Sequence, residues 1–173
     1  AVEPLSWIPL LQAKRAVIAG AHKQLAPTIQ YQEAKRGGLG DTLMARMARL
    51  LPDALKSLLR VQYRMHEHIM EFASSEFYGG QLIAHPSVAG HTAKDLPGVR
   101  DTPLTRVPAR FIDTAGERWD ESFDELTQSF YNSGEAGQIE KVYRQLRAAG
   151  LKPEQIGIIT PYSAQKRLLR EKI

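Results

Sequence analysis

Cysteine is absent from the 173-residue chain. Without a thiol, the chain can form neither a disulfide framework nor a thiolate metal site, and this composition suits a reducing compartment. Long apolar runs are absent as well. Residues 5–11 are too short and too interrupted for a signal peptide or a membrane span, so we expect no membrane partner. Internal repeats and low-complexity tracts are also missing, which leaves an ordinary globular protein.

Histidine and glycine patterns that would indicate a metal or phosphate site are missing too. The phosphate loop G-x-x-x-x-G-K-[ST] does not occur, and the glycines of residues 37–40 are followed by no Gly-Lys-Ser/Thr. His66 and His68 stand two residues apart and would point in different directions on a helix. We therefore predict no metal ligand in this chain. We expect His85 and His91 to be solvated residues of a loop.

The composition permits one ordinary core, since 43% of the residues are hydrophobic. The net charge of +4 tolerates a polyanionic partner but does not identify one. Short apolar runs predict buried strands, as in a parallel sheet, at residues 16–20 and 156–159, and further strands at 58–61 and 107–113, with a shorter strand near 81–83. Helical spacing of apolar residues predicts helices after Asp41, near Glu67 and after Asn132. Strands alternating with helices indicate an α/β fold with a parallel sheet flanked by helices.

Three helix boundaries carry their own signals. We predict that Asp41 caps the first of these helices and that Gly79 ends the second. Asn132 and Glu135 fit a capping box, in which Asn132 caps the third helix and Glu135 reaches back to it. Acidic residues gather in the first part of the segment 114–131. We interpret this segment as a solvated insertion that faces away from nucleic acid.

Residues 62–66, which read Q-Y-R-M-H, follow a predicted strand and precede a predicted helix. The ring of Tyr63 can cover a nucleotide base, and the guanidinium of Arg64 offers a rigid fork of donors to phosphate oxygens. Taken alone, the same pair also fits the end of a strand with a solvated arginine.

Two other stretches have polar residues at the ends of predicted strands. Gln24 follows the run 16–20, where its neutral amide can donate to a terminal phosphate or orient a water; a loop residue that bonds nearby backbone is the alternative. Thr160, Pro161 and Tyr162 follow the run 156–159 and open a predicted helix, with Pro161 in its first turn. Free backbone donors there favour an anion. Contact with an anion and simple capping are equally consistent with Thr160.

Together these stretches resemble the superfamily 1 helicases. The similarity is greatest to the group that contains the helicase of nonsense-mediated mRNA decay and the immunoglobulin mu-binding protein. Its patterns G-D-x-x-Q-L-P-P, Q-Y-R-M-H and T-P-Y-x-x-Q correspond in order to residues 20–27, 62–66 and 160–165. The resemblance covers nearly the whole chain.

The resemblance implies a P-loop NTPase fold of the RecA-like type. Residues 1–55 would form the C-terminal part of the first RecA-like lobe, and residues 58–173 most of the second. The family's phosphate loop and acidic magnesium motif lie before the matched region and its last two motifs after it, so we expect an internal fragment of a motor.

The resemblance also implies roles for the residues at the three motifs. Tyr63 would stack on the base of ATP with support from Gln62. Gln24 and Arg64 would face the terminal phosphates, with Gln24 as the γ-phosphate sensor and Arg64 as an arginine finger. Thr160, Pro161 and Tyr162 would contact nucleic acid.

The parent protein would then be an ATP-dependent helicase that moves 5′ to 3′ on single-stranded DNA or RNA. It would use ATP and Mg²⁺, with the magnesium ligands outside this chain, and would work in the cytoplasm or nucleus. The fragment alone would be inactive.

Two departures from the family pattern favour an alternative. The family's aspartate after Gly20 is Ala21, and the first proline of its Pro-Pro pair is Ala26. A degenerate, non-catalytic helicase that binds nucleic acid or serves as a scaffold would also fit. An unrelated α/β domain with coincidental motifs is a third interpretation.

Overall fold

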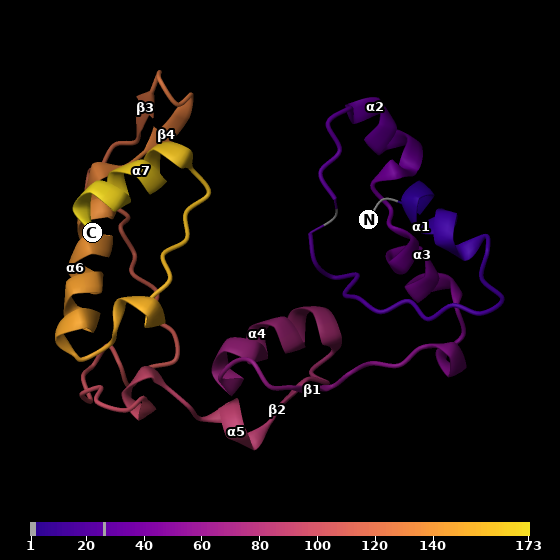
Figure 1. Cartoon of the computed structure of the whole chain (residues 1–173), viewed down its shortest axis with the longest axis horizontal. Helices are drawn as coiled ribbons and strands as arrows, with labels where there is room; N and C mark the ends of the chain where they lie inside the picture. The colour runs from indigo at the N-terminus through magenta and orange to yellow at the C-terminus, as the bar shows by residue number, and fades with distance from the viewer. Residues whose placement is uncertain (1–2, 26) are drawn as a thin grey trace. The chain divides into compact units, whose positions relative to one another are not determined.

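The computed structural model describes residues 3–25 and 27–173, and its contacts divide the chain into two compact units. The first extends to Arg60 and the second runs from Val61 to Ile173 (Figure 1). Each unit is described by itself.

Short helices make up the regular structure of the first unit. They are α1 (Glu3–Leu10), α2 (Gln32–Ala34), a π-helical turn (Lys35–Leu39), α3 (Leu43–Leu50) and a 3₁₀ turn (Asp53–Leu55). Glu3 joins the first helix to the third, since its carboxylate accepts from Arg46 at 2.6 Å and from the Trp7 indole at 3.0 Å.

The cap of α3 differs from the prediction. Thr42 is the N-cap, and its hydroxyl accepts from the backbone N–H of Ala45 at 3.2 Å. Asp41, which we expected in this position, pairs instead with the Arg49 guanidinium. Threonine and aspartate are both good N-caps, so two adjacent candidates define the helix start only to within one residue. In the structure the Asp41 carboxylate is engaged by Arg49, and Thr42 is the cap.

Residues 16–20, predicted as a buried strand, form none of the strands in the described part of the chain. Val17 is 96% exposed. An apolar run shows that a segment favours burial, but a strand also requires a paired neighbour, and none lies beside this run among the described residues.

The second unit holds the remaining elements. They are β1 (Val61–Gln62), α4 (Glu67–Tyr78), β2 (Ile83–Ala84), α5 (Pro86–Ala89), a 3₁₀ turn (Ala93–Asp95), β3 (Ser122–Asp124), β4 (Ser129–Tyr131), α6 (Ser133–Ala148), a 3₁₀ turn (Pro153–Gln155) and α7 (Ser163–Lys172).

The expected parallel sheet is reduced to a two-residue pair in the described chain. β1 and β2 run parallel, with Val61 opposite Ile83 and Gln62 opposite Ala84. Residues 107–113 and 156–159, predicted as strands, are not strands in the structure. Their backbones have no ladder partner among the described residues, so the prediction of a wider sheet is not met here.

Helix α4 confirms the predicted start near Glu67 and the glycine stop. Gly79 adopts a left-handed conformation with φ of 58°, and its backbone N–H bonds to the Ser74 carbonyl. A residue without a Cβ adopts this φ at little cost, which is why a helix stops readily at glycine.

The end of the chain packs α7 against α6 and the β3–β4 hairpin (Figure 1). Few apolar side chains are buried there, and most of them are small. They are Ala136, Ala149, Leu151, Ala164 and Leu169. The acidic stretch 114–131, predicted as a solvated insertion, contains this antiparallel hairpin. It is therefore partly ordered by pairing and by contact with α7.

Candidate nucleotide site

The side chain of Gln62 closes the turn that carries Tyr63 and Arg64. Its Oε1 accepts from the backbone N–H groups of Arg64 at 2.8 Å and Met65 at 2.9 Å, and its Nε2 donates to the Met65 carbonyl at 2.8 Å. The amide mimics a peptide group and satisfies three backbone atoms that would otherwise lack partners. Gln62 thus holds the shape of the turn, a supporting role for its neighbours.

His66 ends this turn and starts α4. It is 8% exposed, and its Nδ1 accepts from the backbone N–H of His68 at 3.1 Å. The imidazole therefore serves as a helix cap, as an asparagine or serine side chain would. This capping role was not predicted from the sequence.

Tyr63 and Arg64 project from the turn held at both ends by Gln62 and His66. Tyr63 is 65% exposed and Arg64 is exposed. Across residues 3–25 and 27–173, the guanidinium of Arg64 makes no hydrogen bond or ion pair. An aromatic face and an unpaired guanidinium fork thus lie on consecutive residues, and these are groups that can bind a base and a phosphate.

The ring of Tyr63 stacks on His85, with ring centroids 4.4 Å apart and an interplanar angle of 30°. We expected His85 to be solvated, and this contact was not predicted. Strand register was the signal that could have found it. Tyr63 and His85 each follow directly on a residue of the parallel pair β1–β2, so the two side chains emerge at the same edge.

Gln24 lies in the first unit, in an irregular turn, and is exposed. Ala21 is exposed in the same loop, and Ala26 falls outside the described residues. Gln24 and Arg64 belong to different units, so each is placed only within its own unit.

Thr160, Pro161 and Tyr162 precede α7, but the helix begins later than predicted. Tyr162 is the N-cap residue and Ser163 the first helical residue, so Pro161 lies before the helix and outside its first turn. The Thr160 hydroxyl accepts from the Tyr162 N–H at 3.4 Å, which closes a short turn instead of capping the helix. The Tyr162 ring meets Phe130 edge-on at 6.1 Å.

Gln165, the last residue of the T-P-Y-x-x-Q pattern, is 5% exposed and contacts Asn132. Asn132 caps α6 as predicted, since its Oδ1 accepts from the Glu135 N–H at 3.0 Å. The second half of the predicted capping box is wrong. The backbone N–H of Asn132 donates to Gln165 Oε1 at 2.9 Å, so the acceptor comes from α7 and not from Glu135.

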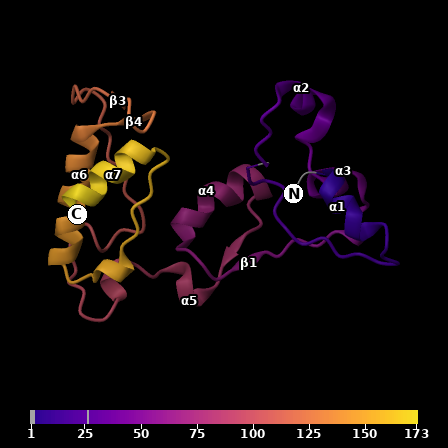
Figure 2. The same ribbon diagram turned by 45° about the horizontal axis from the view of Figure 1, so that its top comes forward.

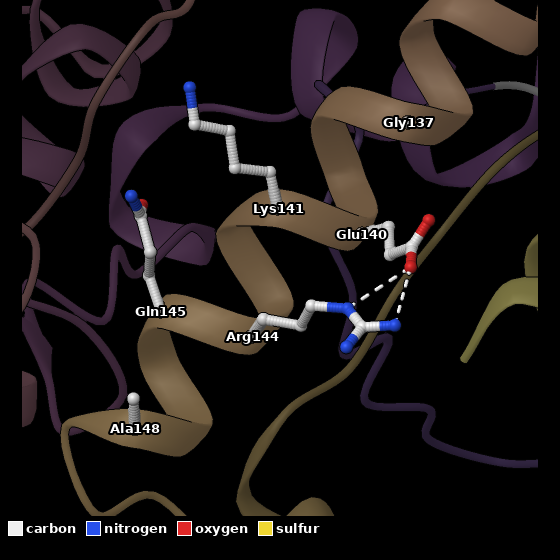
Figure 3. A pocket seen from close by; sticks show the side chains of 6 residues that line it. All are labelled: Gly137, Glu140, Lys141, Arg144, Gln145 and Ala148. Carbon is white, nitrogen blue, oxygen red and sulfur yellow. Dashed lines mark hydrogen bonds and ion pairs between the residues drawn. The ribbon is translucent and has the colours of Figure 1, made fainter.

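Two hollows lie on α6, and neither is lined by residues 62–66 or 160–165. One of about 470 Å³ follows a single helix face, where Arg144 donates to Glu140 at 2.7 and 3.0 Å (Figure 3). The hydrogen bond from Arg144 lowers the pKa of Glu140. The other, about 440 Å³, lies between α6 and residues 156–159 and has a mainly apolar lining. Neither hollow contains a predicted site residue.

The described residues contain no group of three histidine, aspartate or glutamate side chains placed to hold a metal ion. Within the same ranges, no helix has the length and apolar character needed to cross a bilayer.

Comparison with known proteins supports the motif pattern. The sequence model of a family described as an AAA domain matches residues 39–173. The chain is 46% identical over 173 residues to the DNA-binding protein SMUBP-2 of Rattus norvegicus, covering all of this chain and 18% of that protein. It is 39% identical over 188 aligned residues to the DNA polymerase alpha-associated DNA helicase A of Saccharomyces cerevisiae, covering all of this chain and 27% of the helicase.

A third relative is a regulator of nonsense transcripts 1 homolog of Neurospora crassa, 36% identical over 165 residues, with 95% of this chain and 14% of the relative covered. The chain therefore spans between 14% and 27% of the length of these three relatives. It belongs to this AAA domain family, within the superfamily 1 helicases of the group that its motifs indicated.

Proposed function

We propose that the protein containing this chain is an ATP-dependent motor that moves 5′ to 3′ on single-stranded DNA or RNA. The observation that carries the proposal is the turn at residues 62–65. There the Gln62 amide fixes the backbone while Tyr63 and Arg64 remain exposed, and the Arg64 guanidinium has no partner among the described residues. Relatives named as helicases support the same activity.

Each residue would act on a different part of ATP. The Tyr63 ring would cover the base, and the Arg64 fork would bind phosphoryl oxygens and stabilise the charge that develops on them in the transition state. Gln24 would sense the γ-phosphate of ATP and register its loss. Mg²⁺ would neutralise phosphate charge, held by ligands that this chain does not supply.

Nucleic acid would bind through its backbone at the turn before α7. The Thr160 hydroxyl and the exposed Ser163, the first residue of α7, offer polar groups to phosphates without reading bases. Binding of this kind tolerates many sequences and weakens as salt rises. We place the work of the protein inside the cell, in the cytoplasm or nucleus, where such substrates occur.

The test uses the full-length protein and its nucleic-acid-stimulated ATPase rate. Arg64→Ala should lower kcat by about 10³- to 10⁵-fold while ATP still binds, as for other arginine fingers. Arg64→Lys should restore little, because a point charge does not reproduce the planar fork. A full-length protein with no ATPase activity, yet with intact nucleic-acid binding, would instead identify the degenerate scaffold.

We also expect the 173-residue chain on its own to hydrolyse no ATP. It contains no phosphate loop, and that loop supplies much of the charge stabilisation in phosphoryl transfer. Magnesium-dependent turnover by the purified chain would contradict this expectation.

A further inference from the structure

Strand β1, labelled in Figure 2, pairs in parallel with β2, and this pairing brings Tyr63 and His85, the residues that follow the two strands, side by side. Gln62 lies opposite Ala84, and the backbone N–H of His85 donates to the Gln62 carbonyl at 2.9 Å. The residues that follow the two strands are therefore held at neighbouring positions of one edge. Their rings stack at 4.4 Å.

The imidazole of His85 is anchored independently of Tyr63. Its Nδ1 accepts from the backbone N–H of Ser87 at 3.2 Å and lies 2.8 Å from the Ser87 hydroxyl, so it caps α5. Pro86 follows at the first helical position, where its ring fixes φ. His85 is partly buried, and its hydrogen bonds to Ser87 at the start of α5 hold the imidazole in place.

Tyr63 has fewer restraints than His85. It is 65% exposed, and in the described chain its hydroxyl makes no hydrogen bond and its ring stacks on no aromatic side chain other than His85. The anchored imidazole therefore supplies the ring contact that orients the tyrosine. An aromatic ring has two faces, and His85 occupies one of them.

We propose that His85 is a positioning residue for nucleotide binding. Its imidazole covers one face of the Tyr63 ring and leaves the opposite face for the base. This inference rests on the proposed function, in which Tyr63 stacks on the base of ATP. Binding normally costs free energy to immobilise a side chain. When the side chain is already ordered, this cost is absent, which corresponds to roughly 2- to 10-fold in affinity. His85 would contribute that factor without touching ATP.

Two substitutions separate the two tasks of His85. His85→Asn keeps an acceptor that can cap α5 but removes the ring. His85→Phe keeps a ring for Tyr63 but removes the cap acceptor. In the full-length protein, His85→Asn should raise KM for ATP roughly 2- to 10-fold with little change in kcat. His85→Phe should keep KM near the wild-type value and lower the melting temperature instead.

Inorganic triphosphate distinguishes positioning from general damage, because it has phosphates but no base. Its inhibition constant against ATP hydrolysis should be the same in the wild type and in His85→Asn. A parallel loss of ATP and triphosphate affinity would mean that the variant damages the whole site, and would overturn the inference. So would a KM in His85→Phe as high as in His85→Asn.

A double-mutant cycle with Tyr63→Ala completes the test. Because His85 is inferred to act through Tyr63, His85→Asn should have no further effect on KM once Tyr63 is alanine. If Tyr63→Ala raises KM and His85→Asn does not, the positioning role is wrong while the proposed function stands. If neither changes KM, base stacking by Tyr63 is itself wrong, and the proposed function fails at this residue.

Discussion

The side-chain amide of Gln165 forms two hydrogen bonds with the backbone of Asn132, 33 residues earlier in the chain. Oε1 accepts from the Asn132 N–H at 2.9 Å, and Nε2 donates to the Asn132 carbonyl at 3.2 Å. The Asn132 side chain in turn caps α6 and donates to the Trp119 carbonyl at 2.9 Å. One buried amide thus joins the starts of α6 and α7.

Gln165→Glu should lower the free energy of unfolding by about 1–3 kcal/mol, because the carboxylate replaces a donor with an acceptor beside the Asn132 carbonyl. Urea unfolding measures the change. Gln145→Glu is the matched control, since Gln145 is exposed on α6 and makes no side-chain hydrogen bond among the described residues. Equal stability losses in the two variants would show that the contact with Asn132 contributes nothing specific.

Gly134 and Gly137 lie on the same helix, α6, and alanine should act in opposite directions at the two positions. A Cβ on Gly134 would lie 2.2 Å from Cγ of Trp119, whereas a Cβ on Gly137 meets nothing within 4 Å. Gly134→Ala should therefore destabilise the unit by about 1–3 kcal/mol through overpacking. Gly137→Ala should stabilise it by about 0.5–1 kcal/mol, because alanine loses less backbone entropy in a helix.

Thermal and urea unfolding of both glycine variants check this prediction. The Gly134→Ala, Trp119→Ala double variant adds a further test, because removal of the indole should cancel the clash and make the two effects non-additive. A neutral Gly134→Ala would mean that the Trp119 ring moves aside at no cost.

Asp124 should make the stability of the second unit sensitive to acid. The Thr127 hydroxyl donates to its carboxylate at 2.8 Å, and Arg167 pairs with it at 2.6 Å. The pKa of Asp124 lies below its usual 3.8. The hydrogen bond from Thr127 lowers this pKa most, and the Leu126 N–H and Arg167 lower it further. A carboxyl with a lowered folded pKa stabilises the fold above its unfolded pKa, and that contribution is lost as the pH falls through the folded pKa.

We therefore expect Asp124→Asn to be less stable than the wild type at pH 7 and to lose less stability when the pH falls below about 4. Urea midpoints at pH 7, 4 and 3 measure both quantities. The other acidic groups are common to both proteins, so they cancel in the difference. Parallel pH curves for wild type and variant would contradict the prediction.

Nucleic-acid binding by the full-length protein should distinguish neutral from charged contacts before and within α7. Thr160→Val removes a hydroxyl but no charge, so it should weaken binding equally at all salt concentrations. Lys166→Gln should flatten the slope of log K against log salt by about 0.7–0.9 if that lysine neutralises one phosphate. Fluorescence anisotropy with single-stranded DNA and RNA gives both slopes. Unchanged affinity in Thr160→Val would remove Thr160 from the proposed binding site.

Local signals in the sequence predicted helix ends well. Gly79 stops α4 and Asn132 caps α6, because each residue type satisfies a helix terminus through its own backbone or side chain. Asp41 was predicted in place of Thr42 because both residues satisfy the same local rule. The Gln165 acceptor was not foreseen, since it comes from another helix and Glu135 offered a nearer one.

Strands and the contacts between motifs were less predictable. Apolar runs identified segments that favour burial at residues 16–20 and 156–159, but strand formation depends on which segments pair. The stack of His85 on Tyr63 has the same origin, because it follows from the register of β1 and β2. The stretch at residues 62–66 was singled out by its residue types together with its resemblance to the helicase motif, whereas the closure of the turn by Gln62 required coordinates.

The extended segment at residues 156–160 has a consequence for handling the polypeptide in solution. Ile159 is 96% exposed, and the backbone groups of residues 157–159 form no hydrogen bond with other described residues. An exposed apolar segment whose backbone groups have no strand partner is a template for edge-to-edge pairing with a second copy. Preparations of this 173-residue polypeptide should therefore self-associate and precipitate as concentration rises. A charged residue in place of Ile159 should raise solubility without disturbing α6 or α7.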